Sequence, residues 1–567
     1  MARKILKRAT ALAMASAVLL GGCGSQQEAD KIGGGNATET AAGGSANAPK
    51  GNGPGYDYIA GLPKLSEEKV SFTLAVTQEV GQKDWNDMEF FKALEAATNV
   101  HIDFECYPVA SYNDQKNLML ASGEYPDGFL GYLTLSMADL NQYGPMGIFI
   151  PVEDLMEEYS PNYLKRLEER PVLDGLSTAF DGHKYSWGTV NESPSRDFPD
   201  NLYINKAWLD NLGLSMPTTM DEYYEVLKAF KDQDANGNGD PNDEIPYTFL
   251  AFHHTNGYGG FFGAYGRAEA FNNASGTVGD HFVVEDGKLV YQPITEEYKT
   301  AIKELRRFFK DGLFDAEGFV QDGEQYNAKI TSATPIMGSA YMWDIAAMSE
   351  ENRAQYVALK PLKATADSDE AAVHKRQNHV GIQPTGLAIT EKCKNPEILA
   401  QWMDLFYTDE MTILGYYGPD KVTGIDENGV FTFDESVSAD GAGFFQQVLE
   451  NAPYDGSPKF LTFDLTTEKV HLEDDSSLKL DTIEQYYLNA PASVTLPLIN
   501  YTNEENEFLS NYGMSIQSYV MQTQSQWLMG EKDIDKDWDA YVKQLEGLKL
   551  QEFLDTMQGA YDRTVGK

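Results

Sequence analysis

The order of strand-like and helix-like segments near the start of the folded chain constrains its fold most strongly. Residues 70–76 alternate apolar and polar side chains, the pattern of a strand that is buried on one face. Residues 88–94 place apolar side chains at helical spacing, and residues 100–106 again have a strand pattern. Residues 115–133 repeat the order of helix and then strand. This alternation predicts an α/β fold with a mainly parallel sheet, in which ligands bind in loops at the carboxyl ends of the strands.

The length of the chain predicts more than one domain, because 567 residues exceed what a single hydrophobic core usually holds. Its content of 42% hydrophobic and 12% aromatic residues is that of a globular protein. The formal net charge of −43 would repel nucleic acid and an anionic membrane surface, so we expect neither as a partner of the protein body. An anionic ligand is not excluded, because a local cluster of Lys or Arg could hold one.

The first 23 residues have the features of a targeting segment. Basic residues precede an apolar run from Ala11 to Leu20, which is too short to span a bilayer. The following Leu-Gly-Gly-Cys, ending at Cys23, matches a bacterial lipobox, and this resemblance implies cleavage before Cys23 and lipidation of its thiol, which would anchor the protein to a membrane. The alternative is an ordinary secretory signal with an incidental cysteine. Residues 24–56, rich in Gly, Ala, Asn and Ser, predict a flexible tether.

A helix that runs directly into an acidic loop occupies much of residues 208–247. Thr219 and Glu222 have the spacing of a capping box, which predicts the start of the helix. Apolar side chains recur at helical spacing as far as Phe230, and two glycines and a proline within residues 237–241 prevent its continuation. Calcium takes about six to eight oxygen ligands, so oxygens at alternate positions of a tight loop suit it. The loop offers Asp232, Asp234, Asn236, Asn238, Asp240, Asn242, Asp243 and Glu244.

Two arrangements of this loop around a calcium ion are open. The first turns at Gly237 and uses Asp232, Asp234, Asn236, Asp240 and Asp243. The second, which we favour, turns at Gly239 and uses Asp234, Asn236, Asn238, the carbonyl of Asp240, and Asp243 or Glu244. The alternative to a metal site is an acidic turn held by hydrogen bonds from its own side chains. Because either ligand set is nearly saturated, we expect a bound calcium ion to have a structural role.

The run LDNLGLSMPTTMDEYYEVLKAFKDQDANGNGDPNDEIPY, residues 209–247, resembles the family 1 extracellular solute-binding proteins, the lipoprotein receptors of ABC importers. It is most similar to the branch with alginate-binding and oligosaccharide-binding proteins. That branch has Asp-x-Asn-Gly-Asn-Gly, two variable residues and then Asp-Glu-Ile-Pro, and this chain has one additional residue between Gly239 and Asp243. LMLASGEYPD, IMGSAYMWDIA and the segment from HVGIQPTGLAI to ILGYYG are also similar to the family, so the resemblance extends from about residue 60 to the C-terminus.

The resemblance implies a bilobal class II periplasmic-binding-protein-like fold, in which two α/β lobes close about a hinge on a ligand between them. It implies crossovers near residues 200–206 and 380–390, a first lobe of residues 57–200 and about 385–450, and a second lobe of residues 206–380 and about 500–567. The calcium loop at 232–244 would lie in the second lobe and fix the end of the helix before it. A calcium ion in this loop would stabilise the fold of the second lobe.

Sugar-binding sites combine aromatic rings, on which the C–H faces of sugars stack, with carboxylates and amides that pair with hydroxyl groups. From the predicted loops we select seven aromatic and three polar candidates: Trp85, Tyr125, Tyr185, Trp187, Trp343, Tyr416 and Tyr417, with Asn86, Glu124 and Asp127. For any single one, packing in a core is about as frequent as ligand contact. Four tryptophans within helical patterns are expected in a core: Trp208, Trp402, Trp527 and Trp538.

No combination of residues predicts catalysis. The sequence has neither a His-Glu-x-x-His zinc motif nor a Gly-x-Ser-x-Gly nucleophile motif, and it has no Walker loop for ATP. Cys106 and Cys393 form no disulfide framework; they could pair in an oxidising compartment, but two separate thiols are favoured.

Together with the family resemblance, these features imply a monomeric, extracytoplasmic receptor that is not an enzyme and is anchored to the cell membrane by lipid. It would capture an oligosaccharide and deliver it to the permease of an ABC importer. One alternative is a surface lipoprotein that captures polysaccharide without a transporter. The other is a secreted carbohydrate-active enzyme, which the lack of a catalytic motif makes the less favoured.

Overall fold

A computed structural model describes residues 51–566 except 80, 132, 193, 254, 270–277, 346–347, 378–380, 435–436, 438–447 and 473–477. Residues from Pro49 onward form one compact unit. The predicted targeting segment with Cys23, and the tether as far as residue 50, lie outside the described residues. The predicted tether ends before residue 56, because helix α1 (Pro54–Ala60) already packs Tyr56 and Ile59 into the core of the first lobe.

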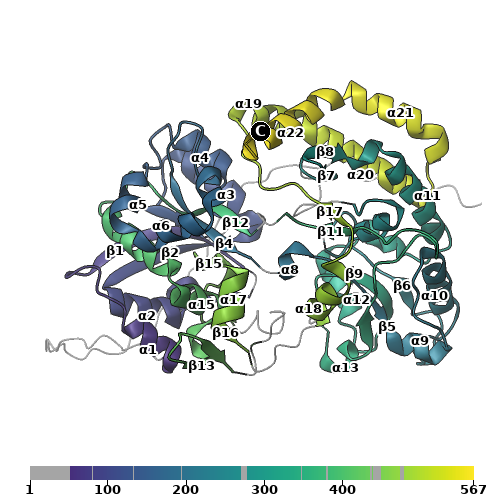
Figure 1. The fold of residues 1–567 in the computed structure, drawn as a ribbon, viewed down its shortest axis with the longest axis horizontal. Helices are drawn as coiled ribbons and strands as arrows, with labels where there is room; N and C mark the ends of the chain where they lie inside the picture. Colours follow the sequence, from purple (N-terminus) through teal and green to yellow (C-terminus); the bar gives the residue numbers. More distant parts are fainter. Residues whose placement is uncertain are drawn as a thin grey trace, which may run out of the picture. The chain divides into compact units, whose positions relative to one another are not determined.

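The first lobe is built on a six-stranded sheet with the order β15-β4-β12-β3-β1-β2 (Figure 1). Its strands are β1 (Val70–Gln78), β2 (Val100–Pro108), β3 (Gly128–Leu130), β4 (Ser186–Asn191), β12 (Ile382–Ile389) and β15 (Phe460–Leu461). Strand β1 is parallel to β2 and β3, and β15 is parallel to β4, which confirms the mainly parallel sheet. Strand β12 comes from a distant part of the chain and lies antiparallel between β3 and β4.

Helices cover both faces of this sheet. They are α2 (Glu89–Thr98), α3 (Val109–Ser122), α4 (Met137–Tyr143), α5 (Glu153–Tyr159), α6 (Pro161–Glu169), α7 (Pro171–Leu176), α14 (Pro396–Asp404), α15 (Asp409–Tyr417) and α17 (Phe463–Lys469), with the 3₁₀ turns η1 (Trp85–Asp87), η5 (Leu405–Tyr407), η6 (Pro419–Lys421) and η7 (Tyr454–Gly456). Successive side chains of a strand point to opposite faces. Leu74 and Val76 of β1 therefore join the larger core with side chains of α2 and α14, whereas Ala75 joins a smaller core with side chains of α3 and α4.

A three-stranded sheet completes the first lobe. It contains β13 (Val422–Ile425), β14 (Phe431–Phe433) and β16 (Val470–His471), and Phe431 and Phe433 are buried in the larger core.

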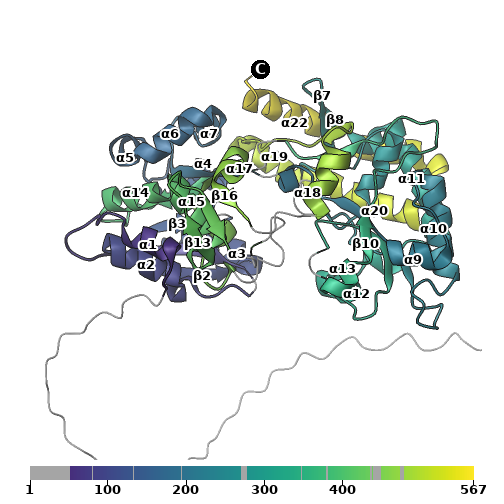
Figure 2. The same cartoon turned by 60° about the horizontal axis from the view of Figure 1, so that its bottom comes forward.

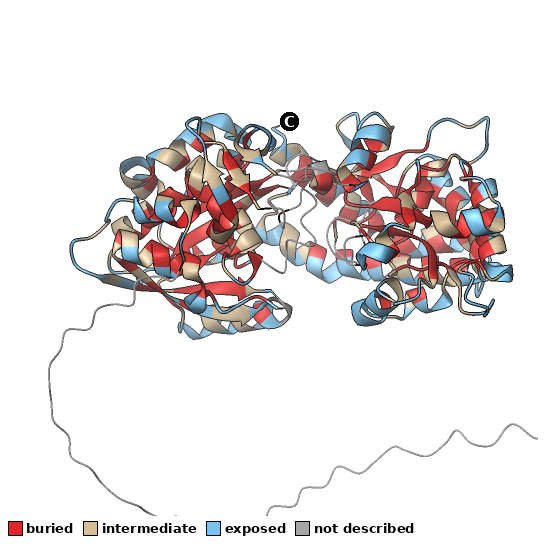
Figure 3. Ribbon diagram, turned by 90° about the horizontal axis from the view of Figure 1, so that it is seen from below, coloured by how far each residue is buried: buried red, intermediate tan, exposed pale blue. Residues whose placement is uncertain are grey.

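The second lobe is built on a four-stranded sheet with the order β10-β5-β9-β6. Its strands are β5 (Asn201–Asn205), β6 (Ile245–Tyr247), β9 (Met337–Met342) and β10 (Tyr356–Ala358). Its helices are α9 (Lys206–Leu212), α10 (Met220–Asp232), α11 (Glu296–Lys310), α12 (Gly323–Ile330), α13 (Glu350–Arg353), α18 (Leu478–Thr482), α19 (Asn503–Phe508), α20 (Met514–Met529), α21 (Ile534–Gly547) and α22 (Leu550–Thr564), with the turns η2 (Gly259–Tyr265), η3 (Gln292–Ile294), η4 (Ala316–Phe319), η8 (Ile483–Tyr487) and η9 (Leu509–Gly513). Two strand pairs accompany them, β7 (Phe282–Glu285) with β8 (Lys288–Tyr291) and β11 (Val373–Lys375) with β17 (Ala492–Val494). Figure 3 shows the buried residues gathered inside each lobe.

Helix α10 matches its prediction. The Thr219 hydroxyl accepts the N–H of Glu222, and the Glu222 carboxylate accepts the N–H of Thr219, so both halves of the capping box are present. The predicted apolar face is buried in the second core: Tyr223, Val226, Leu227 and Phe230. The Asp-Gly pair at residues 286–287, between two runs with a strand pattern, predicts a hairpin turn, and the structure has this hairpin between β7 and β8.

The lobes to which the described strands and helices belong imply three passages of the chain between the two lobes. The first passage, residues 192–200, links β4 to β5 and contains α8 (Pro194–Asp197). The second links β11 to β12, and the third links β16 to α18. The family resemblance implies two crossovers, near 200–206 and 380–390, and the first two passages adjoin these ranges. Phe198 of the first passage packs in a small core with Val373 of β11 and with Ile483 and Tyr487 of η8.

Two helix boundaries differ from the sequence prediction. The Gly-Tyr-Tyr-Gly sequence at residues 415–418 predicts a turn, but α15 continues to Tyr417. Close packing favours glycine at position 415, because a Cβ there would lie 2.6 Å from Ser457 Oγ. The sequence pattern of the C-terminal region predicts one final helix from about Trp538 to Met557, but α21 and α22 are separate, because Lys549 between them adopts a left-handed backbone with φ of 68°. In the described part of the chain, no helix is both long and apolar enough to cross a membrane.

Candidate functional site

The first and second passages both join the first sheet at the same edge. The carboxyl ends of β1, β3 and β4, at Gln78, Leu130 and Asn191, lie at this edge, and the first passage leaves from Asn191. Because β12 is antiparallel to its neighbours, its amino end at Ile382, where the second passage arrives, lies there too. Ligands of open α/β sheets bind outside the carboxyl ends of the strands, so this edge is the candidate binding site.

Four polar side chains meet at this edge, beside β4 and β15. Arg196 Nη2 donates to both carboxylate oxygens of Asp455, at 2.9 and 2.7 Å. Asn191 Nδ2 donates to Asp455 Oδ1 at 2.7 Å, and Lys459 Nζ lies 3.6 Å from the same oxygen. Arg196 belongs to α8 and Asp455 to η7. The ion pair therefore ties the first passage to the first lobe.

Burial and neighbouring charges shift the pKa values of this cluster in opposite directions. Burial would raise the pKa of the Asp455 carboxyl, but Arg196 and Lys459 hold it below its usual value. Burial would lower the pKa of Arg196, but attraction to Asp455 raises it. For Lys459 burial prevails and lowers the pKa to about 8, against the attraction of Asp455. Asp455 is therefore charged at neutral pH, and Lys459 can lose its proton in mildly alkaline solution.

Two stacked tyrosines adjoin the cluster. The rings of Tyr416 and Tyr454 lie 4.6 Å apart with an interplanar angle of 25°, and the Tyr416 hydroxyl donates to the Tyr454 hydroxyl at 3.3 Å. The ammonium of Lys459 lies 5.6 Å from the centre of the Tyr416 ring. Tyr454 has a φ of 52°, which is uncommon for a large side chain. Tyr416, a predicted ligand residue, thus lies beside the charged groups of this edge.

The loop 122–127, which the sequence places at the ligand site, lies at the other end of the strands. It leads from α3 into β3, and a loop that precedes a strand lies at the amino end of that strand. Asp127 accepts a backbone N–H of β1 at 2.9 Å, the Tyr125 hydroxyl donates to Glu391 at 2.7 Å, and Glu124 is exposed. The predicted position of this loop at the carboxyl edge is therefore wrong.

Trp85 and Trp187 lie in the larger core of the first lobe. Trp85 is fully buried and stacks on Phe91 with 5.3 Å between the ring centres. Trp187 is also fully buried, and its indole N–H donates to Ser160 Oγ at 3.1 Å. Both rings therefore pack in the core of the first lobe and do not face a ligand site. The four tryptophans expected in a core are indeed buried: Trp208, Trp402, Trp527 and Trp538.

Three further candidates make contacts within the first lobe. The side chain of Asn86 donates to the carbonyl of Phe104 at 2.8 Å and accepts its N–H at 2.9 Å, which covers the free edge of β2. Tyr185 is buried, and its hydroxyl donates to Asp181 at 2.6 Å. Tyr417 is half-buried against the larger core. These contacts give each residue a structural role.

Trp343 directly follows β9, at the carboxyl end of that strand in the second lobe. Its ring is half-buried, and the ammonium of Lys479 lies 3.5 Å from the ring centre. The end of β9 pairs with the start of β5, where Asn201 faces Met342, so Trp343 lies close to the first passage. Trp343 and Tyr416 are therefore predicted ligand residues that lie beside the passages between the lobes.

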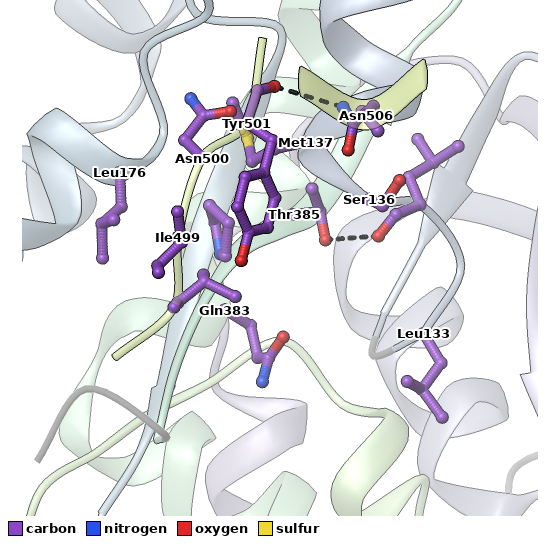
Figure 4. Close-up of a pocket in the computed structure, with 14 residues that line it drawn as sticks. Leu133, Ser136, Met137, Leu176, Gln383, Thr385, Ile499, Asn500, Tyr501 and Asn506 are labelled. Atoms are coloured by element: carbon purple, nitrogen blue, oxygen red, sulfur yellow. Dashed lines mark hydrogen bonds between the residues drawn. The ribbon is translucent and has the colours of Figure 1, made fainter. Parts of the chain in front are cut away.

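A cavity of about 290 Å³ lies next to the same edge (Figure 4). Its walls come from the loop after β3, from β12 at its bulge, and from residues 498–506, which pack against the second core and lead into α19. Helix α19 contacts α4 of the first lobe (Figures 1 and 2). The cavity is lined by Leu133, Leu135, Ser136, Met137, Ala138, Leu176, Gln383, Pro384, Thr385, Leu498, Ile499, Asn500, Tyr501 and Asn506.

The acidic loop after α10 turns at Gly239 around the carboxylate of Asp234. Asp234 Oδ2 accepts the N–H of Gly239 at 2.9 Å, and Gly239 has a φ of 94°. Further along, Asn236 Oδ1 accepts the N–H of Asn238 at 2.9 Å, and Asn238 Oδ1 accepts the N–H of Asp240 at 2.8 Å. These side chains therefore curl inward along the loop.

Two oxygens of this loop are buried without a hydrogen-bond partner: Asp234 Oδ1 and Glu244 Oε2. Burial raises the pKa of Glu244 above its usual value, as expected for a carboxylate that lacks a compensating cation. Among the residues that the structure describes, no three His, Cys, Asp or Glu side chains come together as metal ligands. A calcium site here would thus also need Asn side chains and a backbone carbonyl, which calcium accepts.

Sequence patterns miss the charged cluster because its members are far apart along the chain. Arg196 and Asp455 are separated by 259 residues, and neither lies in a recognisable motif. The one local signal is Asn191, a polar residue at the last position of a buried strand. The cavity wall at residues 498–506 likewise has no sequence signal. Cys106 and Cys393 are both free thiols.

Comparison with known proteins shows which proteins share this sequence and architecture. Residues 78–413 match the family described as bacterial extracellular solute-binding protein. The fructooligosaccharide ABC transporter substrate-binding protein FusA of Streptococcus pneumoniae is 29% identical to this chain over an alignment of 574 positions. The alignment covers 99% of this chain and 98% of FusA. The structure of FusA in complex with kestose has a TM-score of 0.75 at 29% identity and covers 88% of this chain and 99% of that chain.

The structure of a FusA EF-hand mutant in complex with fructo-nystose gives the same TM-score of 0.75, at 27% identity, and covers 88% of this chain and 99% of that chain. The family match spans more than half of this chain, and the two α/β lobes match the bilobal fold of these solute-binding proteins. The chain therefore belongs to the family of bacterial extracellular solute-binding proteins.

Proposed function

We propose that this protein is the substrate-binding receptor of an ABC importer and that it captures an oligosaccharide between its two lobes. The observation that carries the proposal is the likeness to FusA over 98% of FusA, a fructooligosaccharide-binding protein that has been solved in complex with kestose. Two aromatic residues add support: Tyr416 adjoins Lys459 of the polar cluster at the carboxyl edge of the first sheet, and Trp343 follows β9, whose end pairs with the start of β5 next to the first passage.

Delivery to a permease follows from the same proposal. A receptor of this kind closes its lobes on the ligand by a hinge motion, and the closed form docks on the membrane subunits. The three passages would form the hinge. Lipidation of Cys23 would keep the receptor at the membrane surface, with residues 24–53 as the tether.

We further propose a structural calcium ion in the acidic loop. The ligands would be the side chains of Asp234, Asn236 and Asn238, the carbonyl of Asp240, and the carboxylates of Asp243 or Glu244. The hydrogen bond from Gly239 to Asp234 supports this arrangement over the one that turns at Gly237. The buried, unpartnered oxygens of Asp234 and Glu244 fit a cation, which would neutralise their charge.

Binding can be tested on purified protein with fructo-oligosaccharides, other neutral oligosaccharides and uronate oligosaccharides. A ligand that binds only the folded state, present at 100 times its Kd, stabilises that state by about 2.7 kcal/mol and raises the melting temperature. We expect a rise with one sugar class and no shortened products. A flat response to every sugar would overturn the proposal, and release of shorter products would favour an enzyme.

Two matched variants locate the site. Trp343→Ala should weaken binding of that sugar at least about tenfold, or ~1.4 kcal/mol, because it removes a stacking surface. Tyr125→Ala, at the amino end of β3, should leave the Kd unchanged. The reverse result would place the site at the opposite edge. Loss of uptake on deletion of the gene would separate an importer receptor from a lipoprotein that only captures polysaccharide.

A further inference from the structure

The cavity beside the carboxyl edge differs chemically from a sugar site. None of the 14 described residues that line it is Asp, Glu, Lys, Arg or His. Most of its wall is aliphatic, and Figure 4 shows the Tyr501 ring among these side chains, between Asn500 and Gln383. A sugar ring carries several hydroxyl groups, each of which would lose its hydrogen bonds to water in such a cavity. The walls therefore suit an apolar group.

The few polar groups of the lining are already engaged. Thr385 Oγ1 donates to the Leu135 carbonyl at 2.8 Å, and Asn506 Nδ2 donates to the Tyr501 carbonyl at 3.2 Å. Ser136 caps α4, and Asn500 Oδ1 accepts from Asn141 Nδ2 at 3.0 Å. Gln383 is the exception, since its side-chain amide makes no hydrogen bond to a described residue. One free amide can orient a ligand but cannot satisfy a sugar ring.

The wall also contains features that packing alone does not explain. Leu133 is 45% exposed and has a φ of 66°, a left-handed conformation that is unfavourable for a branched side chain. Leu498 is 36% exposed. Strand β12 has a bulge between Gln383 and Leu387, and bulges often occur next to binding sites. Strained backbone, a bulge and exposed leucines thus coincide at one cavity.

A single loop connects this cavity to the polar cluster. Leu133 and Leu135 line the cavity, and Gly131 of the same loop lies against η7, which carries Asp455. A Cβ on Gly131 would lie 2.3 Å from the Gly456 carbonyl oxygen, so the contact requires glycine. At about 290 Å³ the cavity is at the lower limit of the ~300–1,000 Å³ of complete small-molecule sites. It would therefore hold one part of a larger ligand.

We propose that this cavity is a subsite for an uncharged apolar group attached to the sugar, such as an ester-linked acyl group, so that the receptor prefers a substituted oligosaccharide. The inference rests on the proposed function. Because residues 498–501 of the wall pack with the second core, an occupant would touch both lobes and favour the arrangement in which the walls meet.

The test compares the tightest-binding oligosaccharide of the panel with its monobenzoyl esters, separated by position, on purified full-length protein. By calorimetry we expect at least one ester to bind at least about tenfold tighter than the plain sugar, through burial of its ring. Equal or weaker binding of all the esters would overturn the subsite while leaving the receptor function intact. If no sugar of the panel binds, the proposed function fails and the subsite fails with it.

Variants separate the cavity from general effects of the ester. Ala138→Phe fills the cavity, and Leu498→Asn removes part of its apolar wall; each should abolish the gain for the ester and leave the Kd of the plain sugar within about twofold. The matched controls Ala96→Phe on α2 and Leu488→Asn are exposed positions outside the lining, and both should keep the gain. A gain that survives both cavity variants would overturn the proposal.

Discussion

The side chain of Lys459 carries a charged group and is almost fully buried, with only 4% of it exposed. Its ammonium donates to the backbone carbonyl of Asp455 at 2.7 Å and lies 3.6 Å from the carboxylate of that residue. Burial lowers the pKa of Lys459 from 10.5 to about 8 even with this partner. The folded protein thus favours the neutral amine more than the unfolded chain does.

Replacing Lys459 with Met should remove one source of pH-dependent stability. Between pH 8 and 10.5 the unfolded chain binds more protons at this position than the folded protein, so stability rises with pH. The penalty is fully present below pH 8 and is relieved as the pH rises toward 10.5. From pH 7 to 9.5 the free energy of unfolding of the wild type should gain about 2 kcal/mol relative to Lys459→Met.

Urea unfolding at several pH values, followed by tryptophan fluorescence, measures this difference. Lys543→Met, an exposed lysine on α21, is the control and should show no comparable gain. A difference between wild type and Lys459→Met that stays constant with pH would contradict the lowered pKa.

At the scale of elements, α10 and the acidic loop act as one unit. The capping box fixes the start of α10, and the loop begins where the helix ends at Asp232. The second arrangement of the calcium ligands uses Asn238 but not Asp232, and the first uses Asp232 but not Asn238. These two residues therefore distinguish the two arrangements.

Removing calcium with EDTA should lower the melting temperature, and added calcium should restore it, because the proposed ion would neutralise the buried carboxylates of Asp234 and Glu244. Asn238→Ala should weaken calcium binding at least about tenfold, since one of the oxygen ligands is lost. Asp232→Asn should leave calcium affinity unchanged. The opposite pattern would select the first arrangement, and no response to EDTA would identify the loop as an acidic turn without metal.

At the scale of the whole molecule, the order of strands in the first sheet makes distant segments interdependent. Strand β12 lies between β3 and β4, so the segment 54–191 does not contain a complete sheet. Strand β15 then extends the same sheet beyond β4. The sheet of the first lobe is therefore completed only by β12 and β15, which follow the first of the two chain segments that build the second lobe.

A fragment of residues 49–200 should remain largely unfolded, because the centre of its sheet is missing. Joining residues 49–192 to residues 381–472 by a flexible linker should restore a cooperative unit. Circular dichroism and urea unfolding measure both: we expect no cooperative transition for the first fragment and one transition for the second. A cooperative transition in the first fragment would show that β12 is dispensable.

Local patterns predicted the elements whose stability comes from neighbouring residues. Helix α10, with its capping box and buried face, and the hairpin at Asp286-Gly287 depend on contacts within a few positions, so their signals are readable in the chain. Patterns failed where distant contacts decide. Gly415 packs within a helix rather than in a turn, and Trp85 and Trp187 fill a core although they resemble ligand residues.

The sequence by itself determined the class of fold and the acidic loop, because alternating strands and helices and a run of closely spaced oxygen ligands are local properties. It also carried the family resemblance that the comparisons confirmed. Only the tertiary structure decided which loops meet at the carboxyl edge, and it joined Arg196 to Asp455 across 259 residues. The physical reason is that strand order and long-range side-chain contacts arise from packing, which no short segment of the chain contains.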